Sequence, residues 1–241
     1  MDHVATVRQA RYARMPHAVT AEPSLEEAIR VCEAAGAHGI TMHLRGDRRH
    51  VQDADIRMAR SIITTKLNFE LGNHPDIVAL AHEVKPEEVC LVPEVREEIT
   101  TEGGLDVVSQ QETLRPVVER FLDAGIAVSL FVDPELAQIE AAKMLDAPIV
   151  ELHTGAFANA ASEEQKEKEL RRLIEASELA HSLGIQVNAG HGINYENIYD
   201  VLRIPHLAEL NIGHSIVSRA VFTGLGQAVR DMNRCLQGER I

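Results

Sequence analysis

Basic residues are scarce in this chain, in which 24 lysines and arginines stand against 37 aspartates and glutamates, for a net charge of −13. Nucleic-acid backbones are bound by clustered lysine and arginine side chains, and the sequence contains no basic tract of the needed length. The composition therefore argues against a nucleic-acid-binding protein.

Cysteines and long apolar runs are also few. Cys32, Cys90 and Cys235 lie far apart, and their odd number predicts neither a disulfide framework nor a metal-binding knuckle. Apolar stretches stay shorter than the roughly 18 residues needed to span a membrane, and the N-terminus lacks the apolar core of a signal peptide. We therefore expect a cytoplasmic protein in a reducing compartment.

The chain does contain enough apolar sequence for one large core. Its 241 residues are 45% hydrophobic, which suits a single α/β barrel domain covering residues 1–241. Apolar runs that are typical of parallel strands buried on both faces begin near Met1, Gly39, Lys66, Val89, Ile126, Pro148, Ile185 and Ala208.

Helical patterns separate most of these runs, at residues 25–35, 53–63, 113–124, 134–145 and 162–183. Ser24 is a candidate N-cap for the first of these helices, and Gly36 is its expected end. Glycines before the runs near Ile126 and Ile185 are typical of helix C-caps. Eight strand-then-helix steps favour a closed (β/α)8 TIM barrel. A Rossmann fold is disfavoured because no Gly-x-Gly-x-x-Gly follows the first run.

The run at residues 40–44 ends in a segment rich in histidine and arginine. His43, Arg45 and His50 lie at the strand end and in the loop that follows, where parallel barrels place their active sites. Arginine offers a planar fork of donors to phosphate oxygens, and histidine titrates near neutral pH. Two further arginines, Arg48 and Arg49, fit equally well as solvated loop charges paired with a neighbouring aspartate.

Two glutamates follow apolar runs at strand spacing. Glu70 comes two residues after Asn68, so both side chains face the same side of the strand. A carboxylate inside a barrel mouth needs a partner or a raised pKa, and a raised pKa suits general acid–base catalysis. The alternative is a glutamate already on the solvated loop. Glu151 and His153 show the same alternation.

Two later runs end in Gly-His pairs. His191 lies between glycines, so backbone amides there can approach a ligand closely while the imidazole projects at the mouth. Gly213 and His214 repeat the pair at the last run. The loops after strands seven and eight of such barrels often form a phosphate site, and we therefore expect one here.

Together these segments resemble the pyridoxine 5′-phosphate synthase family. The resemblance covers nearly the whole chain and is carried by residues 40–50, 67–70, 90–94, 100–107, 151–155, 187–192 and 209–214. It implies a (β/α)8 barrel with additional helices, assembled as an octamer built from dimers. It also implies the condensation of 1-deoxy-D-xylulose 5-phosphate with 3-amino-2-oxopropyl phosphate to pyridoxine 5′-phosphate, inorganic phosphate and water, without a metal or an organic cofactor.

The resemblance implies roles for individual residues. The two proton acceptors match His43 and Glu70, the proton donor matches His191, and a transition-state stabiliser matches Glu151. The residues that match contacts to the deoxyxylulose phosphate are Asp2, His3, Arg45, His50 and Thr100. Those that match contacts to the aminoketone phosphate are Arg11, Gly192, Gly213 and His214.

The chain departs from the family pattern near its start. Family members open with an apolar strand ending in Asn-Ile-Asp-His, whereas this sequence opens with Met1, Asp2 and His3. We therefore expect a truncated first strand with short or missing pairing to its neighbours. Residues 12–23 are longer than the family's loop, and we expect this segment and the loop after the fourth strand to cover the site.

Two other functions fit part of the pattern. A metal-dependent barrel aldolase or sugar-phosphate epimerase would share the fold and the phosphate loops. Its metal would have to be held by His43, Glu70, His153 and His191, among which there is no closely spaced histidine pair, so we expect no metal. The second alternative is a barrel that binds phosphorylated ligands without catalysing a reaction.

Overall fold

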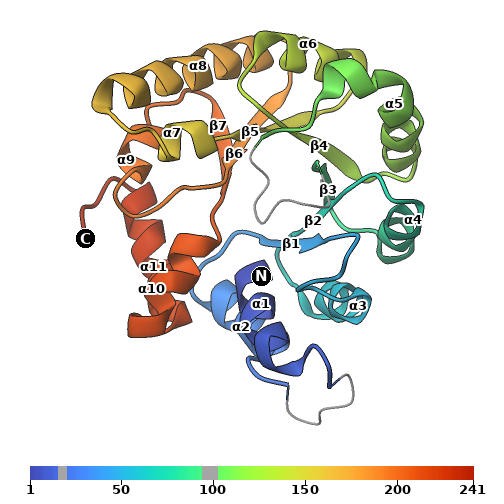
Figure 1. Ribbon diagram of the computed structural model, residues 1–241, viewed down its shortest axis with the longest axis vertical. Helices are drawn as coiled ribbons and strands as arrows, with labels where there is room; N and C mark the ends of the chain where they lie inside the picture. Colours follow the sequence, from blue (N-terminus) through green and yellow to red (C-terminus); the bar gives the residue numbers. More distant parts are fainter. Residues whose placement is uncertain (16–20, 94–102) are drawn as a thin grey trace.

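The computed structural model describes residues 1–15, 21–93 and 103–241. Within them, seven parallel strands form one sheet in chain order, curved around a common centre (Figure 1). The strands are β1 (Ile40–Leu44), β2 (Leu67–Leu71), β3 (Glu88–Leu91), β4 (Ala127–Val132), β5 (Ile149–His153), β6 (Gln186–Gly190) and β7 (Leu207–Asn211).

Helices alternate with the strands, and most of them surround the sheet on its outer side (Figure 1). The helices are α1 (Asp2–Tyr12), α2 (Leu25–Ala34), α3 (Asp53–Ile62), α4 (Pro75–Val84), α5 (Val107–Asp123), α6 (Leu136–Met144), α7 (Gly155–Ala158), α8 (Glu163–Ser182), α9 (Ile198–Val201), α10 (His214–Thr223) and α11 (Leu225–Leu236). In the described part of the chain, no helix is both long and apolar enough to cross a membrane.

Local sequence signals explain where several helices begin and end. Ser24 caps α2 by accepting a hydrogen bond from the Glu27 amide, as predicted. Gly125 and Gly184 have φ of +75° and +74° and end the helices before β4 and β6, which confirms the predicted C-caps. Helix α5 begins earlier than predicted, at Val107, because Asp106 accepts a hydrogen bond from the amide of Ser109.

The two faces of the sheet differ in chemistry because side chains alternate along each strand. One set is apolar and packs into the main core, as Met42, Phe69 and Leu130 show. The other set points to the barrel interior and includes the buried polar residues Asn68 and Glu151. The buried polar side chains of the strands therefore lie inside the barrel, and the apolar core lies between the strands and the helices.

The strand expected near Met1 is wrong, because residues Asp2–Tyr12 form helix α1. Val4 and Arg8 fall one helical turn apart and are both buried, and burying that helical face is favoured over a strand. The residues that the structure describes therefore form seven strands instead of the expected eight. In the described residues β1 and β7 pair only with β2 and β6, which confirms the missing pairing that we expected on this side.

The N-terminus takes over hydrogen bonds that a strand beside β1 would make. The Met1 ammonium group donates to the carbonyl of Thr41 at 2.7 Å, and the Asp2 carboxylate accepts from the backbone amide of His43 at 3.0 Å. In Figure 1 the N-terminus correspondingly lies next to β1, at the inner end of α1. Two segments were expected to cover the site: residues 12–23 and the loop after the fourth expected strand, which is β3. They include residues 16–20 and 94–102, which lie outside the described residues.

Candidate active site

A cavity of about 760 Å³ runs along β1 and β7. Its lining includes Lys66 and Leu207 at the start of strands and His43 and Asn211 near their carboxyl ends, so it extends over the length of the barrel. The predicted site residues that line it are Asp2, His3, His43, Glu70, Glu151, His191, Gly192, Gly213 and His214. Residues far apart in the sequence are thereby brought into one space.

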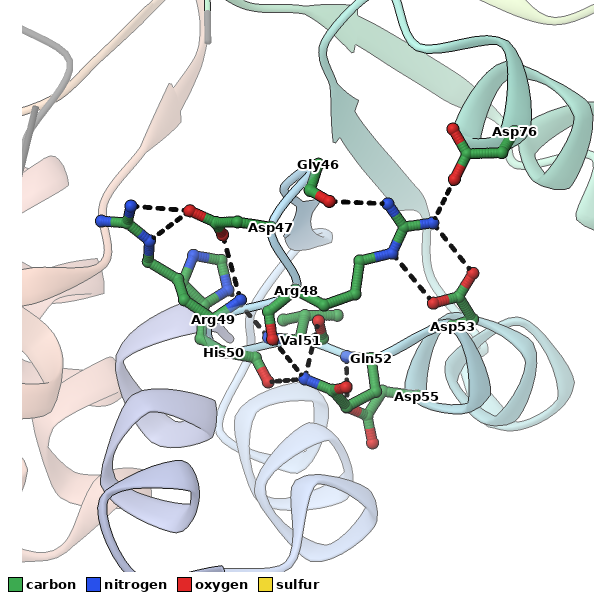
Figure 2. A network of polar contacts seen from close by, with 10 residues as sticks. All are labelled: Gly46, Asp47, Arg48, Arg49, His50, Val51, Gln52, Asp53, Asp55 and Asp76. Carbon is green, nitrogen blue, oxygen red and sulfur yellow. Dashed lines mark hydrogen bonds and ion pairs between the residues drawn. The ribbon is translucent and has the colours of Figure 1, made fainter. Parts of the chain in front are cut away.

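Ion pairs fix the loop after β1 (Figure 2). Arg48 lies 3.1 Å from the Asp53 carboxylate and 2.6 Å from that of Asp76, while Arg49 lies 2.6 Å from Asp47. Arg49 thus pairs with Asp47, as one interpretation of the sequence had it, whereas Arg48 ties the loop to the first turns of α3 and α4. Neither arginine lines the cavity among the described residues.

The His50 ring is held by the backbone amide of the next residue. The Val51 amide donates to Nδ1 of His50 at 2.8 Å, which leaves the proton of the neutral ring on Nε2. Burial lowers the pKa of His50 to about 4, so the ring is neutral at pH 7. Its ring centroid lies 6.0 Å from that of His43. His50 is therefore prepared as a hydrogen-bond donor through Nε2, which suits a phosphate oxygen.

Arg45 is buried beside this loop. Its Nε lies 3.5 Å from the Asp47 carboxylate and has no hydrogen-bond partner in the part of the chain that the structure describes. A buried donor without a partner is costly unless a ligand supplies the acceptor. The position is therefore suited to an anion.

A salt bridge that sequence reasoning missed joins α1 to this region. Arg8 binds Asp55 through two hydrogen bonds of 2.7 and 2.6 Å, and its Nη2 also donates to the backbone carbonyl of His50. Both side chains are nearly buried. The sequence offered only a basic segment containing Arg8, Arg11 and Arg14, with no sign of which arginine has the buried partner.

The N-terminal residues contribute directly to the mouth of the barrel. One ligand-type atom each of Asp2, His43 and His50 lies within 4.8 Å of the others, and the rings of His3 and His214 are 5.2 Å apart. Arg11 is exposed in the last turn of α1 and, among the described residues, is not part of the cavity lining. Thr100 lies outside the described residues.

Glu70 on β2 and Glu151 on β5 form a carboxyl pair inside the barrel, because the charge of Glu151 acts on Glu70. Burial, together with the negative charge of Glu151, raises the pKa of Glu70 to about 8, and His43 partly offsets this. Burial raises the pKa of Glu151 to about 7, against a hydrogen bond of 2.6 Å from Asn211 Nδ2. Both carboxyl groups therefore titrate near neutral pH, which is what general acid–base catalysis needs.

The Gly-His segment after β6 is held in an unusual backbone conformation. His191 has φ of +77°, and the Thr154 hydroxyl donates to the carbonyls of both Gly190 and His191. A Cβ atom on Gly190 would lie 2.1 Å from Oε1 of Glu151, so only glycine fits beside that carboxylate. The turn thus places His191 in the cavity lining, next to the glycine that lies against Glu151. Thr154 was missed because its partners are distant in sequence.

A second histidine, His153, lies beside His191. The two ring centroids are 5.2 Å apart, and Nδ1 of His153 lies 2.9 Å from the Asp133 carboxylate. Burial, followed by the nearby His153, lowers the pKa of His191. The alternation of Glu151 and His153 noted in the sequence thus places both on the inner side of the barrel, one beside Glu70 and one beside His191.

Sequence comparison assigns the family. The model described as "Pyridoxal phosphate biosynthesis protein PdxJ" matches residues 1–238. The chain belongs to this family. A protein of Akkermansia muciniphila named pyridoxine 5'-phosphate synthase is 56% identical over 98% of this chain and 96% of its own length. One of Idiomarina loihiensis with the same name is 51% identical over the whole chain and 96% of its own length.

Solved structures with much lower sequence identity share the fold. Phosphoribosyl anthranilate isomerase from Thermus thermophilus aligns with a TM-score of 0.57 at 16% identity, over 88% of this chain and 94% of its own. A 4-hydroxy-2-oxoglutarate aldolase aligns with a TM-score of 0.59, also at 16% identity, over 88% of each chain. These likenesses show a TIM-barrel-like α/β fold, and the family membership comes from the PdxJ relatives.

Proposed function

We propose that this chain is a pyridoxine 5′-phosphate synthase that condenses 1-deoxy-D-xylulose 5-phosphate with 3-amino-2-oxopropyl phosphate. The observation that carries the proposal is the carboxyl pair Glu70 and Glu151, with pKa values of about 8 and about 7, in a cavity that is also lined by His43 and His191. A reaction with several proton transfers at carbon and oxygen needs groups that titrate near neutral pH. The products are pyridoxine 5′-phosphate, inorganic phosphate and water.

The two phosphate groups would be bound on different sides of the mouth. For the deoxyxylulose phosphate, two buried donors are offered: the Nε2–H of His50 and the Arg45 Nε, which makes no hydrogen bond to any residue that the structure describes. For the aminoketone phosphate, the loops after β6 and β7 offer backbone amides near Gly192 and Gly213. The proposal also assigns the first substrate to Asp2, His3 and Thr100 and the second to Arg11 and His214.

In the proposed mechanism the substrate amine attacks the deoxyxylulose ketone, and the resulting carbinolamine loses water to form an imine. Glu70 then removes protons from carbon, His43 exchanges protons with the sugar hydroxyls, and His191 protonates oxygen that leaves as water or becomes hydroxyl. Glu151 stabilises positive charge that develops on the intermediates. Each proton transfer is worth roughly 10²–10⁴ in rate. Loss of phosphate and an aldol-type ring closure complete the pyridine ring.

Assembly and location are part of the same proposal. We propose a homo-oligomer, an octamer by the family resemblance, working in the cytoplasm. Cys32, Cys90 and Cys235 are free and buried, which is compatible with a reducing compartment.

A metal-dependent reaction is the alternative that one observation favours, namely the proximity of Asp2, His43 and His50. The hydrogen bond from the Val51 amide to Nδ1 of His50 opposes it, because Nε2 then carries the proton and has no lone pair for a metal. Elemental analysis of the purified protein distinguishes the two reactions, since tightly bound stoichiometric metal would support the alternative.

The direct test is incubation of the purified protein with both substrates. A fluorescent pyridine product, released together with inorganic phosphate, is expected. A protein that binds both phosphorylated substrates without forming product would instead be a non-catalytic binding barrel.

A further inference from the structure

A chain of hydrogen bonds inside the barrel ends on Glu151. Asn211 Nδ2 donates to Oε2 of Glu151 at 2.6 Å, and the Thr41 hydroxyl donates to Oδ1 of Asn211 at 2.8 Å. Asn68 Nδ2 donates in turn to Thr41 Oγ1 at 3.5 Å. All donors in this chain point the same way, toward the Glu151 carboxylate, and hydrogen bonds aligned in this way strengthen one another.

This series of hydrogen bonds determines the orientation of the Asn211 amide. Thr41 lies on β1 and Asn211 lies on β7, and in the described residues these two strands are not paired with each other. Because Asn68 donates to the Thr41 oxygen, the hydroxyl hydrogen is available for Asn211 Oδ1. The amide is then oriented with its nitrogen toward Glu151.

Acidic groups face Glu151 from several strands. Glu70 belongs to β2, Glu88 to β3 and Glu209 to β7, and a negative charge on any of them disfavours a further one nearby. Lys66 offsets part of this, since its Nζ contacts Glu88 at 2.8 Å and Glu209 at 2.5 Å.

Two neutral donors reach Glu151 itself. The Cys90 thiol lies 3.8 Å from Oε2, and the Asn211 amide lies 2.6 Å from the same oxygen. The amide hydrogen bond is the stronger of the two because a thiol is a weak donor. Asn211 therefore supplies the main local stabilisation of a Glu151 carboxylate.

We propose that Asn211, oriented by Thr41, is a positioning residue that favours ionisation of Glu151 over that of Glu70, so that the first negative charge of the carboxyl pair lies on Glu151. A hydrogen bond to the ionised form of a carboxyl group favours that form. Glu70 then faces a fixed negative charge, which makes it a stronger base for removing protons from carbon. The role in catalysis rests on the proposed function, whereas the distribution of the proton does not.

The test compares Thr41→Val with Thr41→Ser. Valine keeps the shape of threonine and removes the hydroxyl, whereas serine keeps the hydroxyl. The glutamate side-chain carbonyl carbons of the ¹³C-labelled, unliganded protein are titrated by NMR, and the two signals are assigned with Glu70→Gln and Glu151→Gln. We expect Thr41→Val to raise the pKa of Glu151 and to lower that of Glu70, each by about half to one unit, with Thr41→Ser like the parent.

Opposite shifts are the outcome that a merely structural role would not produce. If both titrations in Thr41→Val stay as in the parent, or if both move in the same direction, the proposal is overturned. Asn211→Leu provides a second variant, and the same opposite shifts are expected in it. Should Asn211→Leu fail to fold, the threonine pair still decides the question.

Kinetics test the consequence for the reaction separately. The acid limb of the kcat/KM profile of Thr41→Val should move to lower pH by about the shift seen for Glu70, the proposed base, with KM nearly unchanged. In a Glu151→Gln background, Thr41→Val should add no further shift. Opposite NMR shifts in a parent protein that makes no pyridine product would uphold the proton distribution and contradict the proposed function. Product formation without the opposite NMR shifts would uphold the proposed function and contradict the proton distribution.

Discussion

Strands β5 and β7 have the same length and very different surroundings. All five residues of β5 are buried, whereas all five of β7 remain at least partly accessible. In the described part of the chain β5 pairs with a strand on each side, and β7 pairs with β6 alone. Burial of a barrel strand thus depends on its neighbours as much as on its own apolar residues.

The same difference extends to the helix that follows β7. All ten residues of α10 are at least partly accessible, and the side chain of Phe222 is 89% exposed. On this open side, side chains connect the strands where backbone pairing ends. Lys66 reaches Glu209, and Thr41 reaches Asn211. Backbone pairing therefore holds β5 along both edges, whereas side-chain hydrogen bonds and ion pairs span the open side between β1 and β7.

The largest expected effect is on the paired side. Glu70→Gln keeps the shape of the side chain and removes its ability to accept a proton, so turnover should fall by roughly 10²–10⁴ with the fold intact. Steady-state kinetics and circular dichroism are the measurements. Glu83→Gln, at an exposed residue bound to Arg57, is the matched control and should behave as the parent. Activity of Glu70→Gln within about threefold of the parent would remove Glu70 from the mechanism.

The largest loss in the free energy of unfolding is expected when the salt bridge between α1 and α3 is removed. Arg8→Met leaves the buried Asp55 carboxylate without its partner, and we expect a loss of about 3 kcal/mol in the free energy of unfolding. Urea unfolding measures it. Arg57→Met, which breaks the exposed pair with Glu83, should leave the urea midpoint unchanged. Equal midpoints for Arg8→Met and the parent would show that α1 adds little to the barrel.

The free energy of unfolding of Glu151→Gln, compared with that of the parent, should increase as the pH rises. The raised pKa of Glu151, about 7 instead of 4.5, means that the folded protein binds this proton more tightly than the unfolded chain. The resulting stability is complete below pH 4.5 and is lost as the pH rises through 7. Glutamine cannot ionise, so at pH 8 the variant should exceed the parent by up to about 3 kcal/mol. Urea unfolding at pH 4.5 and pH 8 checks this, and a gain of the same size at both pH values would contradict it.

The smallest effect expected is from supplying a strand partner on the open side. An apolar segment ending in asparagine, added before Met1, should pair with the edges of β1 and β7 and raise Tm by several degrees, as well as product formation. A glycine-serine segment of the same length is the control. Equal thermal midpoints and rates for the two extended forms and the parent would show that pairing on this side is dispensable.

Much of the barrel follows from the sequence alone. The runs at β1 to β7 are short and apolar, and the caps at Ser24, Gly125 and Gly184 act within one turn of the chain, so local chemistry is enough to place them. The same holds for part of the site. His43, Glu70 and Glu151 could be selected because reactive residues in or at the ends of buried strands must meet inside a parallel barrel.

Tertiary structure alone decided the partners of these residues. The Arg8–Asp55 pair, which fixes the helix at the N-terminus, joins residues 47 positions apart, and the hydrogen bond from Thr41 to Asn211 joins residues 170 positions apart. The same holds for the pKa values of the carboxyl pair, which depend on burial and on charges from other strands. Sequence patterns report neighbours along the chain, whereas burial and charge act through space, so these features appear only once the strands are packed together.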